Sequence, residues 1–553
     1  MSFSSRRRNY LLTPHRRDGL IEWMKSMLMH SFVLDALETT GSDTFSHFEM
    51  LIDEHIEMQN VAENSNTENP SRLKQLVPTV GTFHTRLPLR KAFEAYNAKY
   101  CIAKRKHVCI SFNEIRHILN LAQIMALRNG SSSSWSKDDV SESMEEMSAL
   151  ERWQKSPSPS MLRSNFSNDE DGTMKSGPDL PPPLTLEESA IPVENNGVEK
   201  DESKTLSYHP PYTGPFRGAK MITFDGDQTL YSDGANFESN PQLALYLYLL
   251  LRNGVTVAVV TAAGYEYDTE KYELRLSGLL AYFKEKKLPQ RDCERFYLFG
   301  GECNYLLCLG SDYRLHPVRE FGPGGWLNST KYISETPANW DENAVKDLLD
   351  IAEDIFQSSI KEQNLRARFI RKKRAVGLIP KPHEQIPREA LDETVLRVQA
   401  ALDAHGKKTP GLTLPFCAFN GGRDAWVDVG NKRVGVQILQ SYLGHPVKET
   451  LHIGDQFLNT GNDFAARDVC PCIWITSPDE TTYILKSILR LAGVPLNDSD
   501  ASSDSSDLTP EPSAGVNGSK PKALDFAEMN RRTKAAQLMD VYTGEMISSP
   551  QVK

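Results

Sequence analysis

The sequence has no apolar run of membrane-spanning length and no excess of positive charge. Its longest apolar stretches, Leu243–Leu251 and Val255–Ala263, fall well short of the roughly 20 residues that a transmembrane helix needs. The formal net charge is −10, whereas proteins that bind nucleic acid usually present a basic face. We therefore expect neither a membrane nor a nucleic acid among the partners.

Cysteine is scarce, with 8 residues in a chain of 553, and shows no metal-ligand spacing. Cys470 and Cys472 flank a proline inside an apolar run, and no second pair accompanies them. Scattered thiols are typical of a reducing compartment, which favours a cytoplasmic location. The basic first residues, MSFSSRRRNYLLTPHRR, leave a mitochondrial address as an alternative, although Pro14 and the lack of an amphipathic stripe argue against it.

Composition divides the chain into segments of different character. Helical periodicity over residues 17–128 includes a capping-box pattern, with Ser111 three residues before Glu114. Two later stretches are rich in serine, proline and acidic residues, which is typical of disordered linkers. The predicted segments are a basic arm (1–16), a helical domain (17–128), a linker (129–207), a sheet core (208–270 and 425–492), an inserted cap (271–424), a second linker (493–522) and a C-terminal docking segment (523–553).

Buried strands and helices alternate within the sheet core. The run MITF at 221–224 and the run VTVAVV at 255–260 have the length and composition of buried strands, and the helix between them ends at Gly254. The pattern returns in the helix RVGVQILQSYLG and the strands TLHIG and CIWIT. We therefore predict an α/β fold, with a doubly wound, Rossmann-like parallel sheet, an inserted α+β cap and a helical N-terminal region.

Residues suited to phosphate chemistry follow these strands in a fixed order. Each one alone fits an ordinary role, such as a turn carboxylate, a strand-end hydroxyl or a solvated lysine. Their common position at strand ends or helix entries favours a single site on one edge of the sheet. The residues are Asp225, Asp227, Thr229, Thr261, Lys432, Asp455 and Asp463.

The carboxylates among them suit a hard cation. We expect Mg²⁺ to be held by the Asp225 carboxylate, the Asp227 carbonyl and the Asp455 carboxylate. In this interpretation Asp225 attacks phosphorus as a nucleophile, and Asp227 protonates the leaving oxygen and then activates water.

The remaining residues would bind the phosphate or support the site. Thr261 and Lys432 are expected to bind phosphate oxygens, the lysine as a compact charge. Asp463 is expected to orient Lys432 or the water shell of the metal. The basic run Arg371–Arg374 in the cap could face an anionic ligand or remain a solvated surface.

The motif order resembles that of the haloacid dehalogenase-like superfamily. The chain looks like a member of the IMP-specific 5′-nucleotidase family of fungi and protists. The features that carry this resemblance are the motif sequences FDGDQTLYSDG and GDQFLNTGND, the long insertion and the helical N-terminal region. This resemblance implies Mg²⁺-dependent hydrolysis of IMP to inosine and phosphate in purine salvage, a homotetramer, and activation by ATP at the helical N-terminal region. It also implies that Asp233 contacts the substrate and that Lys99 and His117 belong to the ATP site.

Two other functions stay open at this point. A sugar-phosphate phosphatase or phosphohexomutase shares the Asp-x-Asp-x-Thr motif and an inserted cap, so only a substrate comparison separates it from a nucleotidase. A chain that binds nucleotide without catalysis is the alternative from another class, and the intact motif set argues against it.

Overall fold

The structure is a computed structural model, and it describes most of the chain between residues 18 and 496. The described residues are 18–30, 36–65, 70–104, 110–129, 216–232, 234–238, 240–328, 337–408, 414–496, 538–539 and 546–547. Nearly all of the two predicted linkers, the basic arm and most of the predicted docking segment lie outside these residues. None of the described helices is both long and apolar enough to cross a membrane.

A seven-stranded sheet forms the centre of the larger unit, and its strand order is β11-β10-β1-β2-β3-β4-β5. The strands from β11 to β3 are parallel, and β4 and β5 continue one edge as antiparallel strands. The predicted parallel sheet is therefore confirmed for most of its width. The strands are β1 (Met221–Phe224), β2 (Thr256–Val260), β3 (Phe296–Gly300), β4 (Tyr305–Leu309), β5 (Leu315–Pro317), β10 (Thr450–Gly454) and β11 (Cys472–Trp474).

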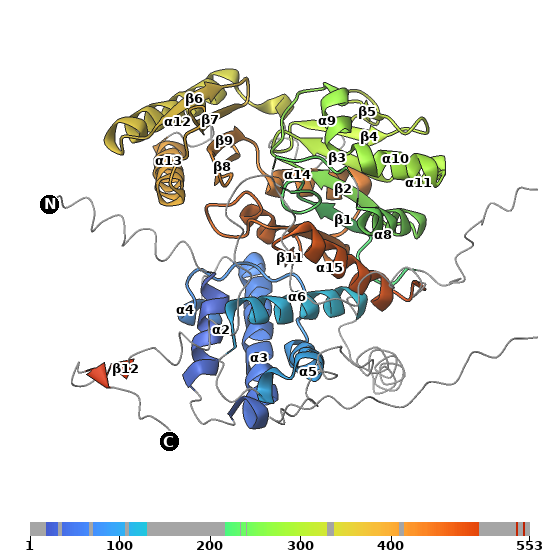
Figure 1. The fold of residues 1–553 in the computed structure, drawn as a ribbon, viewed down its shortest axis with the longest axis vertical. Helices are drawn as coiled ribbons and strands as arrows, with labels where there is room; N and C mark the ends of the chain where they lie inside the picture. The colour runs from blue at the N-terminus through green and yellow to red at the C-terminus, as the bar shows by residue number, and fades with distance from the viewer. Residues whose placement is uncertain are drawn as a thin grey trace, which may run out of the picture. The chain divides into compact units, whose positions relative to one another are not determined.

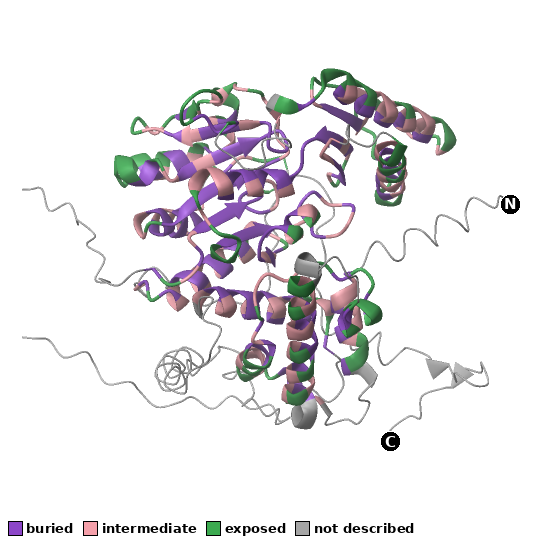
Figure 2. Cartoon of the chain, turned by 180° about the vertical axis from the view of Figure 1, so that it is seen from behind, coloured by how far each residue is buried: buried purple, intermediate pink, exposed green. Residues whose placement is uncertain are grey.

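Both faces of this sheet are covered, as its continuous apolar strands require. Successive side chains of a strand point to opposite faces, so Ile222 and Val257 pack with α8, α10 and α15, whereas Met221 and Ala258 pack with α14. The strands appear buried over most of their length in Figure 2. The associated helices are α8 (Pro241–Arg252), α9 (Thr269–Arg275), α10 (Ser277–Glu285), α11 (Gln290–Cys293), α14 (Lys432–Leu443) and α15 (Pro478–Leu491), with the short helices η5 (Val447–Glu449) and η6 (Phe464–Asp468).

A second, antiparallel sheet forms the inserted module, with strand order β6-β7-β9-β8. Its strands are β6 (Ala367–Arg371), β7 (Ala375–Pro380), β8 (Phe416–Asn420) and β9 (Ala425–Val429), and α12 (Glu342–Glu362) and α13 (Arg388–Lys408) cover one face (Figure 1). A short helix, η4 (Pro337–Asn339), precedes α12. The inserted module thus combines helices with an antiparallel sheet.

The boundaries of this module differ from the predicted cap at 271–424. Strands β3 to β5 belong to the main sheet, and β9, which was placed in the core, belongs to the small sheet. The runs FYLFG and YLLCL were recognisable as strands. Strand patterns do not specify which sheet a strand joins, because that depends on pairing with residues distant in sequence.

The helical N-terminal region is built from α2 (Gly19–His30), α3 (Ala36–Ser65), α4 (Arg72–Leu76), α5 (Leu89–Tyr100), η1 (Ile102–Lys104) and α6 (Phe112–Asn129). The capping box at the start of α6 is confirmed: Ser111 N donates to Glu114 Oε2 at 2.8 Å and Glu114 N donates to Ser111 Oγ at 3.2 Å. These helices share one apolar core, against which Trp474 of β11 packs.

A second unit comprises residues 155–199 and 497–553. Within it the structure describes only β12 (Leu538–Met539) and β13 (Met546–Ile547), which pair antiparallel.

Candidate active site

Asp225 follows β1 directly and is nearly fully buried. Its backbone N–H donates to the carbonyl of Ile453 at 2.9 Å, which continues the β1–β10 ladder to the strand end. The next residue, Gly226, lies against the hydroxyl groups of Tyr231 and Thr261, and a side chain there would collide with them. The position after Asp225 therefore requires a residue without a side chain.

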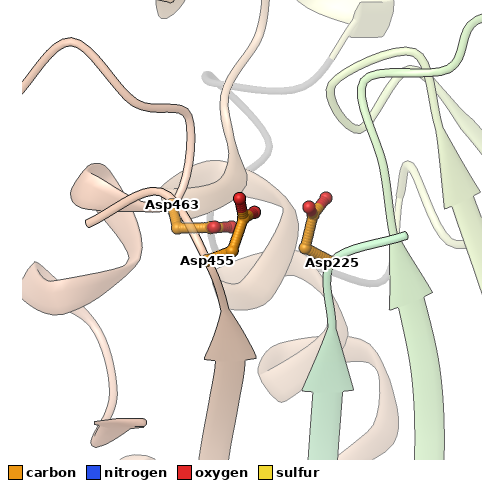
Figure 3. Close-up of side chains that lie close together, drawn as sticks. All are labelled: Asp225, Asp455 and Asp463. Atoms are coloured by element: carbon orange, nitrogen blue, oxygen red, sulfur yellow. The ribbon is translucent and has the colours of Figure 1, made fainter. Parts of the chain in front are cut away.

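Two more carboxylates come from the segment after the neighbouring strand β10. Asp225, Asp455 and Asp463 each offer an oxygen, and these oxygens lie within 4.8 Å of one another (Figure 3). Gly454 is needed between strand and loop, since a Cβ there would stand 2.3 Å from Asp463 Oδ2. The predicted meeting of strand-end carboxylates on one sheet edge is thus present.

Lys432 lies in the middle of these carboxylates and has no exposed side-chain surface. It is the first residue of α14, whose N-cap Asn431 accepts a hydrogen bond from Val434 N at 3.0 Å. Its Nζ donates to Asp225 Oδ1 at 2.6 Å and to Asp463 Oδ1 at 2.5 Å. A lysine that sequence alone could leave on the surface is therefore part of a buried ion-pair network.

Asp463 is held from several sides. His452 Nε2 lies 3.0 Å from Asp463 Oδ1, and the Gln456 N–H donates to Asp463 Oδ2 at 2.9 Å. His452 is in turn oriented by Thr223, whose Oγ1 lies 2.8 Å from its Nδ1. Both oxygens of Asp463 therefore accept hydrogen bonds, and one of them binds the Lys432 ammonium.

Burial and charge shift the acidities of this cluster. Burial raises the pKa of Asp225 to about 7, although the Lys432 ammonium acts in the opposite direction. Burial, reinforced by the charges of Asp225 and Asp463, raises the pKa of Asp455 well above its usual value. Burial acts in the same sense on Asp463, but Lys432 and His452 outweigh it and hold the pKa of that carboxyl below its ordinary value.

The donor set fits a divalent cation. Oδ1 of Asp455 is buried and has no hydrogen-bond partner among the described residues, next to the Asp225 carboxylate. Carboxylate oxygens grouped in this way are ligands that Mg²⁺ prefers. A cation between Asp225 and Asp455 would compensate the negative charge of both buried carboxylates.

The Asp227 side chain makes a contact that sequence analysis missed. Its Oδ1 accepts hydrogen bonds from Arg275 Nη2 at 2.6 Å and from Gly234 N at 3.0 Å. Arg275 also donates to Ala235 O at 2.5 Å and lies 4.7 Å from the centre of the Tyr231 ring. Arg275 ends α9, about fifty positions downstream, and no spacing rule connects it to the motif.

Thr261 directly follows β2, at the predicted strand end, and is buried at the edge of the cavity. Its Oγ1 accepts a hydrogen bond from Ala263 N at 3.1 Å. The predicted substrate contact Asp233 lies outside the described residues.

A further buried carboxylate, Glu302, was not identified from the sequence. It follows Gly301 after β3 with φ of 50°, an uncommon conformation for a residue other than glycine. Its Oε1 accepts a hydrogen bond from Asn462 Nδ2 at 3.0 Å, and its Oε2 has no partner among the described residues. Burial raises its pKa to about 7.

A cavity of about 920 Å³ opens above the carboxylates and is lined by both the main sheet and the inserted module. The small sheet turns Trp426 and Asp428 toward it, because alternate residues of β9 pack on the helices behind. Lys372–Arg374 and Arg388 bring positive charge to the lining. Arg371 does not take part, since it pairs with Asp350 at 2.8 Å.

The two residues predicted for an ATP site lie away from the cavity lining. Lys99 Nζ is 3.5 Å from Tyr483 Oη and 5.1 Å from the centres of the Tyr483 and Tyr100 rings. His117 Nε2 lies 3.3 Å from Glu480 Oε1. Both residues therefore face α15 from the N-terminal helices. Burial, helped by nearby Arg490 and Lys486, lowers the pKa of Lys99 to about 8.

Fold and site together define a phosphoric monoester hydrolase of the α/β type. The family described as IMP-specific 5′-nucleotidase matches residues 2–139 and 212–485, and the chain belongs to this family.

Relatives of that name cover nearly the whole chain. The IMP-specific 5′-nucleotidase 1 of Neurospora crassa is 35% identical to this chain, and the alignment covers 88% of this chain and 97% of that protein. The IMP-specific 5′-nucleotidase 1 of Yarrowia lipolytica is 33% identical, and the alignment covers 87% of this chain and 96% of that protein. An IMP-bound structure of a Plasmodium falciparum IMP-nucleotidase mutant aligns with a TM-score of 0.62 at 31% identity, covering 86% of this chain and 94% of that chain. An ATP-bound structure of the Plasmodium protein aligns with a TM-score of 0.59 at 31% identity, covering 86% of this chain and 85% of that chain.

Proposed function

We propose that this protein hydrolyses inosine 5′-monophosphate to inosine and phosphate through an aspartyl-phosphate on Asp225. The observation that supports this most directly is the buried contact of Lys432 with both Asp225 and Asp463, beside Asp455, at the carboxyl end of the parallel strands. This arrangement provides a nucleophilic carboxylate, a fixed positive charge and a candidate cation site at one point.

The reaction begins at the Asp225 carboxylate. One of its oxygens attacks phosphorus, the bond from phosphorus to the ribose 5′-oxygen breaks, and the electron pair of that bond passes to the 5′-oxygen. The Lys432 ammonium, 2.6 Å away, favours the ionised nucleophile and can compensate the charge of a phosphate oxygen. The Thr261 hydroxyl can donate a hydrogen bond to another phosphate oxygen.

Asp227 is proposed to move the protons. As an acid it protonates the departing 5′-oxygen of inosine, and as a base it takes a proton from the water that attacks the phosphorylated Asp225. Water attack at phosphorus releases phosphate and restores the carboxylate. Arg275 Nη2 donates to Asp227 Oδ1 at 2.6 Å and would orient this carboxylate for both steps.

Mg²⁺ would be held by the carboxylates of Asp225 and Asp455 and the main-chain carbonyl of Asp227. When bound it supplies positive charge next to the oxygens of the transferred group. Asp463 is not needed as a ligand, because both of its oxygens already accept hydrogen bonds.

The inserted module is proposed to act as the cap that selects the nucleotide. Trp426 and Phe419 line the cavity together with Lys372–Arg374, which gives an apolar surface for a base and positive charge for an anion. The Plasmodium protein that binds IMP in its structure aligns over most of the chain, which favours IMP over a sugar phosphate. Asp233 is proposed to contact the substrate from the segment after the Asp-x-Asp-x-Thr motif.

ATP is proposed to activate the enzyme at a site that includes Lys99 and His117. Lys99 lies beside two tyrosine rings and near Lys486 and Arg490, a combination that suits a purine nucleotide with its phosphates. The ATP-bound structure of the Plasmodium relative supports ATP as a ligand. The proposal also includes a homotetramer, a cytoplasmic location and a role in purine salvage. Measurement of the particle mass in solution tests the proposed homotetramer.

A panel of substrates tests the proposed function. With Mg²⁺ and ATP present, phosphate release from IMP should exceed release from AMP and from glucose, mannose and trehalose phosphates. Asp225→Asn should abolish release from all of them while keeping the fold, as judged by circular dichroism. A preference for a hexose phosphate would assign the chain to the sugar-phosphate alternative. Absence of any phosphate release by the unaltered protein would favour the non-catalytic alternative.

A further inference from the structure

Trp474 connects the candidate metal site to the helical N-terminal region. Its indole Nε1–H donates to the main-chain carbonyl of Asp455 at 2.8 Å, and its ring contributes to the cavity lining. The ring also packs beside Phe457, with 6.3 Å between centres, and under the guanidinium of Arg467 at 5.8 Å. Trp474 therefore fixes the peptide group of the residue whose carboxylate is proposed to hold the cation.

The backbone of Trp474 is held by side chains of α6. Asn120 accepts from Trp474 N at 3.1 Å and donates to Trp474 O at 2.7 Å, so one amide side chain satisfies both main-chain groups. Arg116 Nη1 donates to the same carbonyl at 2.5 Å and to Glu480 Oε1 at 2.7 Å. Asn120 and Arg116 are 5% and 3% exposed, so these hydrogen bonds form away from water.

The position of β11 explains why these contacts matter. It is a three-residue strand at the edge of the main sheet, and an edge strand presents unpaired N–H and C=O groups. Helix α6 supplies partners for those groups where another strand would otherwise lie. The end of β11, and with it the Trp474 indole, is therefore aligned by a helix from a different part of the chain.

A second set of contacts joins the same two regions. His84 Nε2 lies 2.9 Å from the Arg467 carbonyl, and Arg467 Nη1 forms an ion pair with Asp18 at 2.6 Å. Arg467 lies in η6, which directly follows Asp463. The segment that carries both downstream carboxylates is thus held at two points by the N-terminal region.

We propose that Trp474, held by Asn120 and Arg116, is a positioning residue for the cation site, so that the helical N-terminal region forms part of the catalytic framework. This inference rests on the proposed function, because it takes Asp455 to be a metal ligand. Removal of the indole N–H frees the Asp455 peptide group to rotate and takes its carboxylate out of alignment with Asp225. Supporting contacts of this kind affect metal affinity by about ten- to a hundredfold in known sites.

The test measures metal binding directly on the full-length protein. Mn²⁺ affinity is determined by electron paramagnetic resonance for the unaltered chain, Trp474→Phe and Asn120→Ala, with the Mg²⁺ dependence of phosphate release as a second measurement. We expect the Mn²⁺ Kd to rise about tenfold for Trp474→Phe and several-fold for Asn120→Ala. The KM for IMP at saturating Mg²⁺ should change by less than about twofold, because the phenyl ring keeps the cavity surface.

Two control variants separate positioning from general loss of packing. Trp326→Phe alters a fully buried tryptophan outside the cavity lining. Gln123→Ala removes a buried amide on α6 that donates at 2.8 Å to Thr85, within the N-terminal region itself. Both controls should keep the unaltered Mn²⁺ affinity.

The outcomes distinguish this inference from the proposed function. If Asp455→Asn weakens Mn²⁺ binding while Trp474→Phe and Asn120→Ala bind it as the unaltered protein does, the positioning role is wrong and the metal site stands. If Asp455→Asn binds Mn²⁺ normally, the metal site itself is wrong and the inference falls with it. Should Trp474→Phe fail to fold, the Mn²⁺ affinity of Asn120→Ala, compared with that of the control Gln123→Ala, decides whether the positioning role holds.

Discussion

Removal of Lys432 leaves two buried carboxylates without their shared cation. In Lys432→Met, Asp225 and Asp463 remain buried without their shared cation, and loss of one partner from a buried pair costs about 3–5 kcal/mol. We expect a marked fall in melting temperature and a loss of activity of at least about a hundredfold. Calorimetry and phosphate release measure the two effects. The matched control Lys448→Met, at an exposed position just beyond α14, should change neither the melting temperature nor the activity.

Arg275 is expected to act through Asp227. In Arg275→Gln the 2.6 Å contact to Asp227 is weakened, so the carboxyl is less well aligned for proton transfer. We expect kcat for IMP to fall by about tenfold or more, as for other misplaced acid–base groups, with a smaller change in KM. Steady-state kinetics at saturating Mg²⁺ measures this. An unchanged kcat would show that Asp227 needs no support from Arg275.

Glu302 should make stability depend on pH. Its pKa is raised from the usual 4.5 to about 7 by burial, so the unfolded chain ionises first and stability falls as pH rises between these values. Glu302→Gln removes that penalty while keeping an oxygen for Asn462. We expect the variant to be more stable than the unaltered chain at pH 8, by up to about 3 kcal/mol because one pKa unit corresponds to about 1.36 kcal/mol, and to differ little at pH 4.5.

Chemical denaturation at both pH values measures this difference. Glu384→Gln, at an exposed position in the inserted module, is the control and should show no pH-dependent gain. Equal stability of Glu302→Gln and the unaltered chain at pH 8 would mean that Glu302 is not a destabilising carboxylate.

At the scale of elements, strand β9 has one face toward the cavity and one toward the helices. Trp426 lines the cavity, whereas Val427 is fully buried beneath α12 and α13. We expect Trp426→Ala to raise KM for IMP about tenfold, because an aromatic contact to a base is worth about 1–3 kcal/mol. Val427→Ala should instead lower stability by about 2 kcal/mol and leave KM unchanged. An unchanged KM for IMP in Trp426→Ala together with a raised KM in Val427→Ala would mean that the substrate does not contact this face of β9.

The main sheet and its site residues were predictable because local patterns specify them. MITF and the Asp-x-Asp-x-Thr motif fix both the strand β1 and the position of its carboxylates, and the capping box fixes the start of α6. Residues that act through tertiary contact were not predictable. Arg275, Glu302 and Trp474 reach the site only after strands and helices far apart in sequence have packed together.

The boundaries of the inserted module could not be predicted from the sequence either. Strands β3 and β4 were recognisable as strands, but the pairing with residues distant in sequence decides which sheet a strand joins. The same limit applies to Arg371, which continues the basic run toward the cavity in sequence but points to Asp350 in the fold.

At the scale of the whole molecule, the N-terminal helices contact the main sheet next to the proposed ATP residues. We expect Lys99→Met to weaken ATP binding by about tenfold or more, because a half-buried cation near phosphate groups is lost. Calorimetric titration with ATP and the ATP concentration for half-maximal stimulation measure this. Lys91→Met, at an exposed position on the same helix, is the control. Unaltered ATP affinity in Lys99→Met would move the site away from α5.

The phosphorylated Asp225 is the most direct test of the proposed chemistry. IMP labelled in its phosphate is mixed with the full-length protein and Mg²⁺, quenched with acid during turnover, and the labelled peptide is identified. The proposed mechanism predicts a hydroxylamine-sensitive label on the peptide that carries Asp225, absent from Asp225→Asn. Release of labelled phosphate with no label on the protein at any time, or a label on another residue, would contradict it.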